Sequence, residues 1–215
     1  KKIKDRPEVL YYRGNIDILN EHKSIAVVGS RKISAVGAKL AYNAGSIIGK
    51  NGFNLVNGLA LGCDAEALKG ALAAGGKCAV VLPCGINEIY PKSNQWIAEE
   101  VLKQGGCLIS EYPEGTRPEK YRFVQRDRLQ SGMSQGVLVV EAMEKSGTMH
   151  TAEYAKKQNR RLACYYHGLL KYSTGNNVLE NLYQAAVIKT NEDLENYLCE
   201  IADIEEYTQL SFDFV

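Results

Sequence analysis

The stretch "SIAVVGSRKISAVG", Ser24 to Gly37, decides the fold class. It opens with a short apolar run, Ile25–Val28, which breaks at Gly29-Ser30-Arg31 before a helix-like pattern begins. Proteins of the α/β class build phosphate sites from a strand, a tight turn and a helix in this order. A turn that binds a dinucleotide would carry two more glycines at fixed offsets, and they are missing here. The stretch therefore predicts a phosphate site and leaves its ligand open between a nucleotide, a sugar phosphate and a longer phosphate chain.

Similar apolar runs recur along the chain, separated by stretches rich in Ala, Leu, Glu and Lys, which favour helices. The runs are continuous and not alternating, as expected for strands that are buried on both faces of a parallel sheet. This order predicts an α/β fold with a doubly wound, mostly parallel, Rossmann-like sheet. The predicted strands are Ile25–Val28, Phe53–Val56, Cys78–Leu82, Cys107–Ile109, Val137–Val140, Leu162–Tyr165 and Ala186–Ile188. The predicted helices include Ala38–Lys50, Ala65–Ala74 and Gln95–Lys103.

Both ends of the chain depart from this alternation of predicted strands and helices. Residues 1–20 are expected to form a lead segment on the flank of the sheet, with Leu10-Tyr11-Tyr12 as its apolar anchor. Residues 21–190 are expected to form the Rossmann-like core. The tail, residues 191–215, is expected to be helical over Glu192–Ile201 and then extended and acidic.

The composition predicts a reduced, cytoplasmic protein. The 215 residues are 45% hydrophobic and 24% charged, which suits one soluble domain with a small appendage. No apolar run approaches the length of a membrane span, and nothing resembles a signal peptide. The six cysteines show no metal-ligand spacing, so we expect neither a metal nor another cofactor.

The net charge of +1 hides an asymmetry between the body and the tail. Residues 190–215 hold eight acidic residues and no Lys or Arg. Residues 1–189 therefore carry all 26 basic residues but only 17 of the 25 acidic ones. One interpretation is a solvated surface with an acidic tail. The other is a basic body that attracts a polyanion.

Ligands in a doubly wound sheet bind beyond the carboxyl ends of the strands, so the residues that follow each strand are the candidate site. Glycine and small hydroxyl residues dominate there, beside two cations, Arg31 and Lys145. Glycine lets a ligand approach the backbone, and free N–H groups at helix starts attract anions. We therefore expect the first turn to offer the backbone N–H groups of Gly29 and Ser30 and the Arg31 side chain to one phosphate. The candidate phosphate-binding residues at these positions are Gly29, Ser30, Arg31, Gly58, Ala60, Lys145, Ser146 and Gly147.

The segment "RPEKYRFVQRDRLQSG", Arg117 to Gly132, interleaves cations with aromatic residues. This pattern suits single-stranded nucleic acid, because charge follows the backbone while a ring stacks on a base. The alternative is the start of a surface helix with one core phenylalanine. The candidate contacts are Lys120, Phe123, Arg126 and Arg128.

Catalytic constellations are weak. The three histidines are scattered, and His150 is expected on a helix face and not as a general base. Asp64 is expected to act as a cap or first-turn acid of its helix. No catalytic residue is therefore assigned.

An ordered set of motifs resembles the DNA-processing protein A (Smf) family, the single-stranded DNA-binding proteins of bacterial transformation. The matching sequence segments cover roughly residues 8–190. They are "LYYRGN", "AVVGSR", "LVNGLALGCDAEALKGAL", "GGKCAVVLPCGINEIYP", "LISEYPEGTRPEKYRFVQRDRLQSGMSQGVLVVEAMEKSGTMHTAEYA" and "GNNVLENLYQAAVI".

The resemblance implies a Rossmann-like core that dimerises, binds single-stranded DNA in a positive pocket and helps to load the recombinase RecA in natural transformation. The family's pocket residues fall on positions that the charge and stacking argument also selects. They are Arg31, Lys120, Phe123, Arg126 and Arg128, with Lys145 and Ser146-Gly147.

The chain departs from the family pattern at several positions. The usual Arg-Asn-Arg is Arg126-Asp127-Arg128, which places an acid in the expected phosphate pocket. The usual Phe-Pro is Phe123-Val124, and Leu68 replaces the usual His that follows Asp64. We also expect a member without the winged-helix tail that many relatives carry. A divergent paralogue in phage defence or on a mobile element is an alternative to the transformation role.

Two other functions fit the same fold. A phosphoribohydrolase of the same superfamily needs a Glu where this chain has Thr151, which argues against an enzyme. A sensor of small nucleotides would use the same pocket, because a mononucleotide and one unit of DNA present similar groups.

The segment "QLSFDF", Gln209 to Phe214, resembles the short peptide by which bacterial proteins dock on the DNA sliding clamp. The alternative is a tail that packs its own Leu and Phe on the domain or on a dimer partner.

Overall fold

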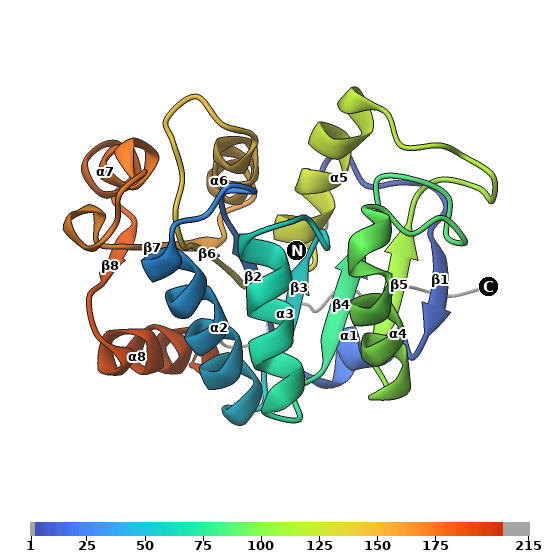
Figure 1. Cartoon of the computed structure of the whole chain (residues 1–215), viewed down its shortest axis with the longest axis horizontal. Helices are drawn as coiled ribbons and strands as arrows, with labels where there is room; N and C mark the ends of the chain where they lie inside the picture. Colours follow the sequence, from blue (N-terminus) through green and yellow to red (C-terminus); the bar gives the residue numbers. More distant parts are fainter. Residues whose placement is uncertain (1–2, 204–215) are drawn as a thin grey trace.

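A computed structural model describes residues 3–203 and shows one eight-stranded sheet between two layers of helices (Figure 1). The strand order is β1-β5-β4-β3-β2-β6-β7-β8, and every neighbouring pair is parallel except β1 with β5. The strands are β1 (Tyr11–Gly14), β2 (Ser24–Val28), β3 (Asn54–Asn57), β4 (Cys78–Val81), β5 (Cys107–Ser110), β6 (Gly136–Val139), β7 (Arg161–Tyr165) and β8 (Ala186–Ile188). The predicted doubly wound, mostly parallel sheet is confirmed.

The helices divide between the two faces of this sheet. The front layer in Figure 1 contains α2 (Ala35–Lys50), α3 (Cys63–Ala73), α4 (Gln95–Lys103) and α8 (Asn191–Ala202). The other layer contains α1 (Ile18–Glu21), α5 (Lys120–Gly132), α6 (Gly147–Lys157) and α7 (Thr174–Tyr183). Two short 3₁₀ turns, Lys92–Asn94 and His167–Leu169, complete the described elements. None of the helices in residues 3–203 combines the length and apolar character that crossing a bilayer requires.

The central strands are buried on both faces, which explains why their sequences are apolar without alternation. The front core packs residues such as Ile48, Leu68 and Ile97 against the sheet, and the rear core packs Leu129 and Ala152. Two separate apolar layers around one sheet are the arrangement that the alternating strands and helices predict.

Element boundaries move by a few residues from the predicted ones. The second predicted strand lies one residue later, at Asn54–Asn57, and α2 begins at Ala35, three residues before the predicted start. Ser34 explains the earlier start, because its hydroxyl accepts a hydrogen bond from the Gly37 amide at 3.0 Å and caps the helix. The predicted bounds of Gln95–Lys103 and Ala186–Ile188 are confirmed.

The lead segment joins the sheet. It contributes β1, an antiparallel edge strand paired with β5. The predicted apolar anchor is confirmed only for Leu10, which is partly buried and packs against the rear core. Tyr11 and Tyr12 are exposed, and the fully buried contacts of the segment come from Ile16 and Ile18. The helix predicted at Glu192–Ile201 is confirmed as α8, whereas the acidic extension and Gln209–Phe214 lie outside the described residues.

Candidate nucleic-acid site

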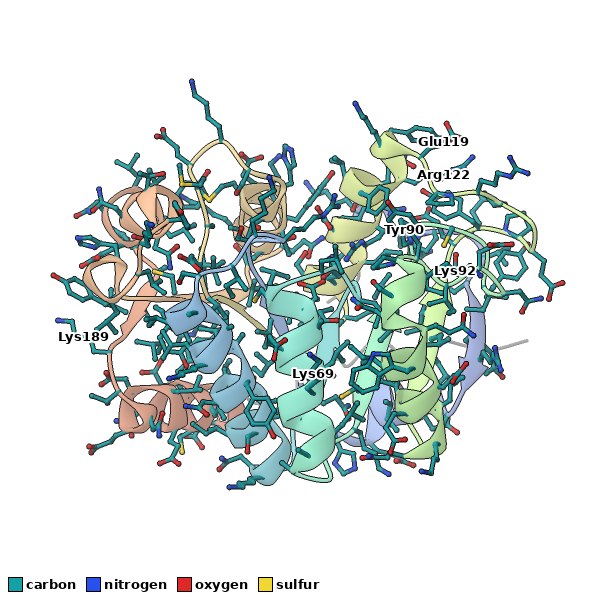
Figure 2. All side chains as sticks on the ribbon, viewed as in Figure 1. Lys69, Tyr90, Lys92, Glu119, Arg122 and Lys189 are labelled. Atoms are coloured by element: carbon teal, nitrogen blue, oxygen red, sulfur yellow. The ribbon has the colours of Figure 1, made fainter. Side chains whose placement is uncertain are left out.

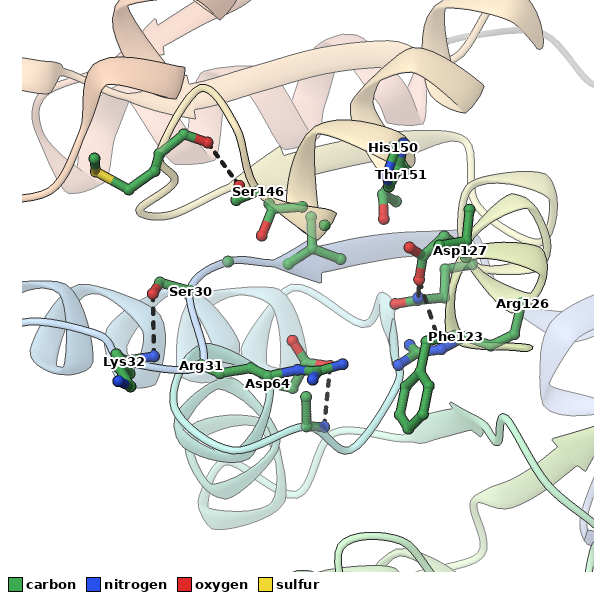
Figure 3. A pocket seen from close by; sticks show the side chains of 18 of the residues that line it. Ser30, Arg31, Lys32, Asp64, Phe123, Arg126, Asp127, Ser146, His150 and Thr151 are labelled. Carbon is green, nitrogen blue, oxygen red and sulfur yellow. Dashed lines mark hydrogen bonds and ion pairs between the residues drawn. The ribbon is translucent and has the colours of Figure 1, made fainter. Parts of the chain in front are cut away.

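A pocket of about 850 Å³ opens at the carboxyl ends of the central strands (Figure 3). β2 and β6 are neighbours in the sheet, but the connection after β2 leads to the front layer and the connection after β6 leads to the rear layer. The two connections therefore leave on opposite faces of the sheet. Such a topological switch point is where ligands bind in open α/β sheets. The pocket is lined by Val28, Gly29, Ser30, Arg31, Lys32, Ala60, Asp64, Tyr90, Lys120, Phe123, Val124, Arg126, Asp127, Gln130, Met143, Ser146, Gly147, Thr148, His150, Thr151 and Tyr172.

Nine of the twelve predicted site residues line this pocket, although they come from four separate loops and helices. They are Gly29, Ser30, Arg31, Ala60, Lys120, Phe123, Arg126, Ser146 and Gly147. Gly58, Arg128 and Lys145 are not among its lining residues.

Asp64 shapes the loop that follows β3. Its carboxylate accepts hydrogen bonds from the amides of Gly58 and Ala60 at 3.0 and 3.2 Å. The Asn94 side-chain amide donates to the carbonyls of Leu59 and Ala60 at 2.9 and 3.2 Å from the other side. The prediction of a first-turn acid is therefore confirmed, and Asp64 also fixes the floor of the pocket.

Arg126 is the central cation of the pocket. Its side chain is only 5% exposed, and its guanidinium lies against Gly58, where a β-carbon would overlap it. Its Nε lies 3.6 Å from the Asp127 carboxylate and is buried without a hydrogen-bond partner. Burial raises the pKa of Asp64, and the charge of Arg126 opposes that rise. A buried guanidinium whose nearest carboxylate lies beyond hydrogen-bond distance is favourable for a phosphate, because the phosphate oxygens can accept direct hydrogen bonds from it.

Asp127 lies in the pocket and does not point away from it (Figure 3). Burial raises its pKa to about 6, while Arg126 opposes the shift and the charge of Asp64 adds to it. His150 from α6 and Arg31 also lower this pKa by their charges. The Gln130 side chain donates to the Asp127 carboxylate at 2.8 Å.

The backbone N–H group of Ser30, in the Gly-Ser-Arg turn, bonds to the loop that follows β6 and is not free for a ligand. The Ser30 amide donates to the Glu141 carbonyl at 2.7 Å, so the prediction that this N–H group contacts a phosphate is wrong. The helix after this turn begins only at Ala35, where Ser34 is the N-cap, and the Ser34 amide donates to the Glu141 carboxylate at 2.8 Å. Gly29 is required by packing, since a β-carbon there would overlap the side chain of Cys63.

Two buried polar residues that the sequence interpretation missed hold this edge together. Glu141 accepts from the amides of Ser34 and Tyr172, at 2.8 and 3.0 Å, and joins three loops. Asn176 donates to the carbonyls of Val140 and Tyr165, both at 2.9 Å, and accepts from the Ala142 amide. A polar residue directly after a buried strand is the only signal that the sequence offers for Glu141.

The start of α6 supplies the backbone donors that the first turn does not. Ser146 occupies the N-cap position without capping the helix, because its hydroxyl donates to the Met143 carbonyl at 2.6 Å. Gly147 and Thr148, in the first turn, line the pocket. An uncapped helix start has free N–H groups and a positive dipole end, which together favour an anion.

Two aromatic rings, Phe123 and Tyr90, also line the pocket and form an aromatic wall. Phe123 makes an edge contact with Tyr90, with ring centroids 5.5 Å apart, and the Arg31 guanidinium lies 4.9 Å from the Phe123 ring centre. Figure 2 shows Tyr90 beside the first turns of α5. Tyr90 is 44% exposed, and sequence reasoning did not select it as a site residue. Exposed rings beside cations are the surface on which unpaired bases stack.

Arg128 has a different role from the predicted one. Its guanidinium binds the Glu111 carboxylate through both terminal nitrogens, at 2.5 and 2.9 Å, and its Nε donates to the Asp5 carbonyl at 2.9 Å. It therefore fastens the N-terminal segment to α5 and the end of β5. Alternate residues of a helix face different sides, so Arg126 enters the pocket and Arg128 does not.

We expect Arg128→Ala to lower the free energy of unfolding by about 3 kcal/mol, because it leaves the half-buried Glu111 carboxylate without its partner. Binding at the pocket should change by less than about twofold, since no phosphate contact is lost. Urea unfolding and fluorescence polarisation with labelled oligo-dT measure the two effects. A loss of affinity in the folded variant would show that Arg128 contributes to DNA binding, as the sequence predicted.

The residues between 3 and 203 bring no three His, Cys, Asp or Glu side chains together in a group that would hold a metal ion. His150 lines the pocket from α6, and Thr151 is buried at the position where phosphoribohydrolases carry Glu. The pocket is lined by cationic side chains, by the start of α6 and by the two aromatic rings.

The sequence matches known proteins over most of its length. The model of a family described as "DNA recombination-mediator protein A" matches residues 1–198. "Protein Smf" of Synechocystis sp. is 38% identical over 162 residues, which cover 74% of this chain and 40% of that protein. "DNA processing protein DprA" of Bacillus subtilis is 36% identical over 162 residues, which cover 75% of this chain and 54% of that protein. The matched regions thus span about half the length of these curated relatives.

Solved structures show the same architecture. DNA processing protein A from Helicobacter pylori superposes with a TM-score of 0.83 at 30% identity, covering 92% of this chain and 90% of that one. The protein from Streptococcus pneumoniae gives a TM-score of 0.79 at 32% identity and covers 90% and 68% of the two chains. A molybdenum cofactor binding protein from Rippkaea orientalis shares the fold alone, with a TM-score of 0.60 at 17% identity.

Proposed function

Because the chain belongs to the DNA recombination-mediator protein A family, we propose that it binds single-stranded DNA in the strand-end pocket. It is a DNA-processing protein of the recombination-mediator type. The observation that carries the proposal is the buried Arg126, which meets Arg31, Lys120 and an aromatic wall in one pocket. The Helicobacter pylori relative is described as binding single-stranded DNA.

In the proposed mode, a phosphate lies between Arg126, Arg31 and the start of α6, and Lys120 contacts the next phosphate. The bases lie against Phe123 and Tyr90. The protein acts by binding, without catalysis, because Thr151 lacks the carboxylate that the phosphoribohydrolase chemistry needs. Assistance in RecA loading, a homodimer and a role in transformation in the cytoplasm follow from the family resemblance and belong to the same proposal.

We expect wild-type protein to bind labelled oligo-dT with an affinity that falls as salt rises, since phosphate contacts release counterions. Arg31→Ala and Lys120→Ala should each weaken binding by about tenfold, the value of one charged hydrogen bond. Each should also reduce the slope of log affinity against log salt by about 0.7. Fluorescence polarisation in a salt series measures both. Unchanged binding in the two folded variants would refute the proposal.

A small nucleotide is the second candidate ligand, because a pocket of about 850 Å³ has the size of a small-molecule site. A thermal-shift comparison of AMP, cyclic AMP and oligo-dT separates the two. Stabilisation by a mononucleotide alone would favour a sensor. Release of ribose 5-phosphate from AMP would instead establish an enzyme.

A further inference from the structure

One exposed strip of α6 connects the pocket with a second hollow. His150, Tyr154 and Lys157 follow one another at helical spacings of four and three residues, which places them on one side of the helix. His150 lines the pocket, whereas Tyr154 and Lys157 line a separate hollow of about 620 Å³. Lys4, from the N-terminal segment, lines the same hollow. We call His150, Tyr154, Lys157 and Lys4 the α6 strip.

The α6 strip repeats the chemistry of the pocket. The Lys157 ammonium lies 5.7 Å from the centre of the Tyr154 ring, and Tyr154 is partly exposed. Within residues 3–203, neither Lys4 nor Lys157 forms an ion pair with a carboxylate. Asp5, the one acid that lines the hollow, is occupied by Arg128, whose Nε lies 3.4 Å from its carboxylate. A ring beside unpaired cations is a platform for a base and its phosphates.

The helix that carries the strip is firmly placed. Gln158, just after α6, accepts a hydrogen bond from the Ser131 hydroxyl at 2.7 Å and donates to the Arg128 carbonyl at 3.1 Å. These bonds join the ends of α5 and α6. The strip is therefore a fixed surface, and binding to it requires little ordering of the protein. Glu153 is the one acidic residue of α6.

We propose that the α6 strip is a track along which a DNA strand continues from the pocket to the second hollow. The inference rests on the proposed function, because the strand must first occupy the pocket. From His150 to Lys157 the helix rises by about 10 Å, the length of about three nucleotides at the 3.4 Å spacing of stacked bases. Oligonucleotides that only fill the pocket will not reach Lys157, whereas longer ones will.

The test measures the affinity of the full chain for oligo-dT of about 4 and about 15 nucleotides, the lower and upper parts of the range of single-strand site sizes. Lys157→Glu and Tyr154→Ala should each weaken binding of the longer strand by about fivefold or more, the effect of one lost base stack or phosphate contact. Binding of the shorter strand should stay the same. Lys157→Glu should also lower the salt slope for the longer strand only.

Lys50→Glu is the matched control, because Lys50 is an exposed lysine at the end of α2 in the opposite helix layer and undergoes the same charge change. If the wild-type chain binds the shorter strand but Lys157→Glu leaves the longer one unaffected, the track is refuted and the proposed function stands. An equal loss at both lengths also refutes the track. If the wild-type chain binds neither length, the proposed function falls and the track falls with it. Circular dichroism confirms that each variant is folded.

Discussion

Gly58→Ala is expected to reduce binding of single-stranded DNA by at least about tenfold, although Gly58 does not line the pocket. A β-carbon at this position would overlap the terminal atoms of the Arg126 guanidinium. The guanidinium must then leave its place between Asp64 and Asp127, and the phosphate loses the buried cation that we propose binds it. Polarisation with oligo-dT, with a thermal melt on the same sample, separates lost affinity from lost folding.

The control for Gly58→Ala is a double-mutant cycle with Arg126→Ala. If the glycine acts only by leaving room for the arginine, the double variant should bind as weakly as Arg126→Ala alone. Losses that add would show that Gly58 acts independently of Arg126 and would contradict this explanation. Arg126→Ala is itself expected to destabilise the fold by about 3 kcal/mol, because two buried carboxylates lose their counter-charge.

Asp127→Asn is expected to tighten DNA binding about fivefold at pH 7.5, because a like charge near a phosphate costs on the order of 1 kcal/mol. The substitution also restores the residue that the family usually carries. In the wild type, burial raises the pKa of Asp127 to about 6, so its carboxylate is charged at neutral pH and becomes neutral as the pH falls. Wild-type affinity should therefore rise between pH 7.5 and 5.5, and the affinity of Asp127→Asn should change much less over this range. Polarisation across the pH series is the measurement.

The same group makes folding stability depend on pH. Asp127 has a folded pKa of about 6, above the ordinary value of 3.8. Its contribution to stability is therefore fully present below about pH 3.8 and is lost as the pH rises through about 6. At pH 7.5, Asp127→Asn should raise the free energy of unfolding by an amount on the order of 2 kcal/mol. Asp17→Asn, at an exposed carboxyl outside the pocket, should change neither affinity nor its pH dependence. Equal pH profiles for the wild type and Asp127→Asn would assign the titration to another group, such as Asp64.

The strands and the edge of the sheet that carries the candidate site were predictable from sequence, because continuous apolar runs such as Cys78–Val81 are typical of strands that are buried on both faces. Arg31, Lys120 and Phe123 could also be selected from sequence, because their charge and aromatic character are local properties. The N–H donor of the first turn was assigned wrongly, because the carbonyl that occupies it belongs to Glu141, more than a hundred residues away. Tyr90 was missed because nothing beside it in the sequence indicates that Phe123 lies against it.

By itself, the sequence determined the α/β class and indicated a candidate site at the strand ends with residue types that suit a phosphate chain, since periodicity and charge are carried by neighbouring residues. The tertiary structure alone decided which of two nearby arginines enters the pocket. Arg126 and Arg128 are two residues apart on α5, so they face different sides, and only the packing of α5 shows that Glu111 holds one while Gly58 makes room for the other. The structure also decided that Asp127 lies in this pocket. Burial there raises the pKa of its carboxyl, and the nearby charge of Arg126 opposes that rise. Contacts between distant segments depend on the fold as a whole, and these contacts determine which of the candidate residues meet at the site.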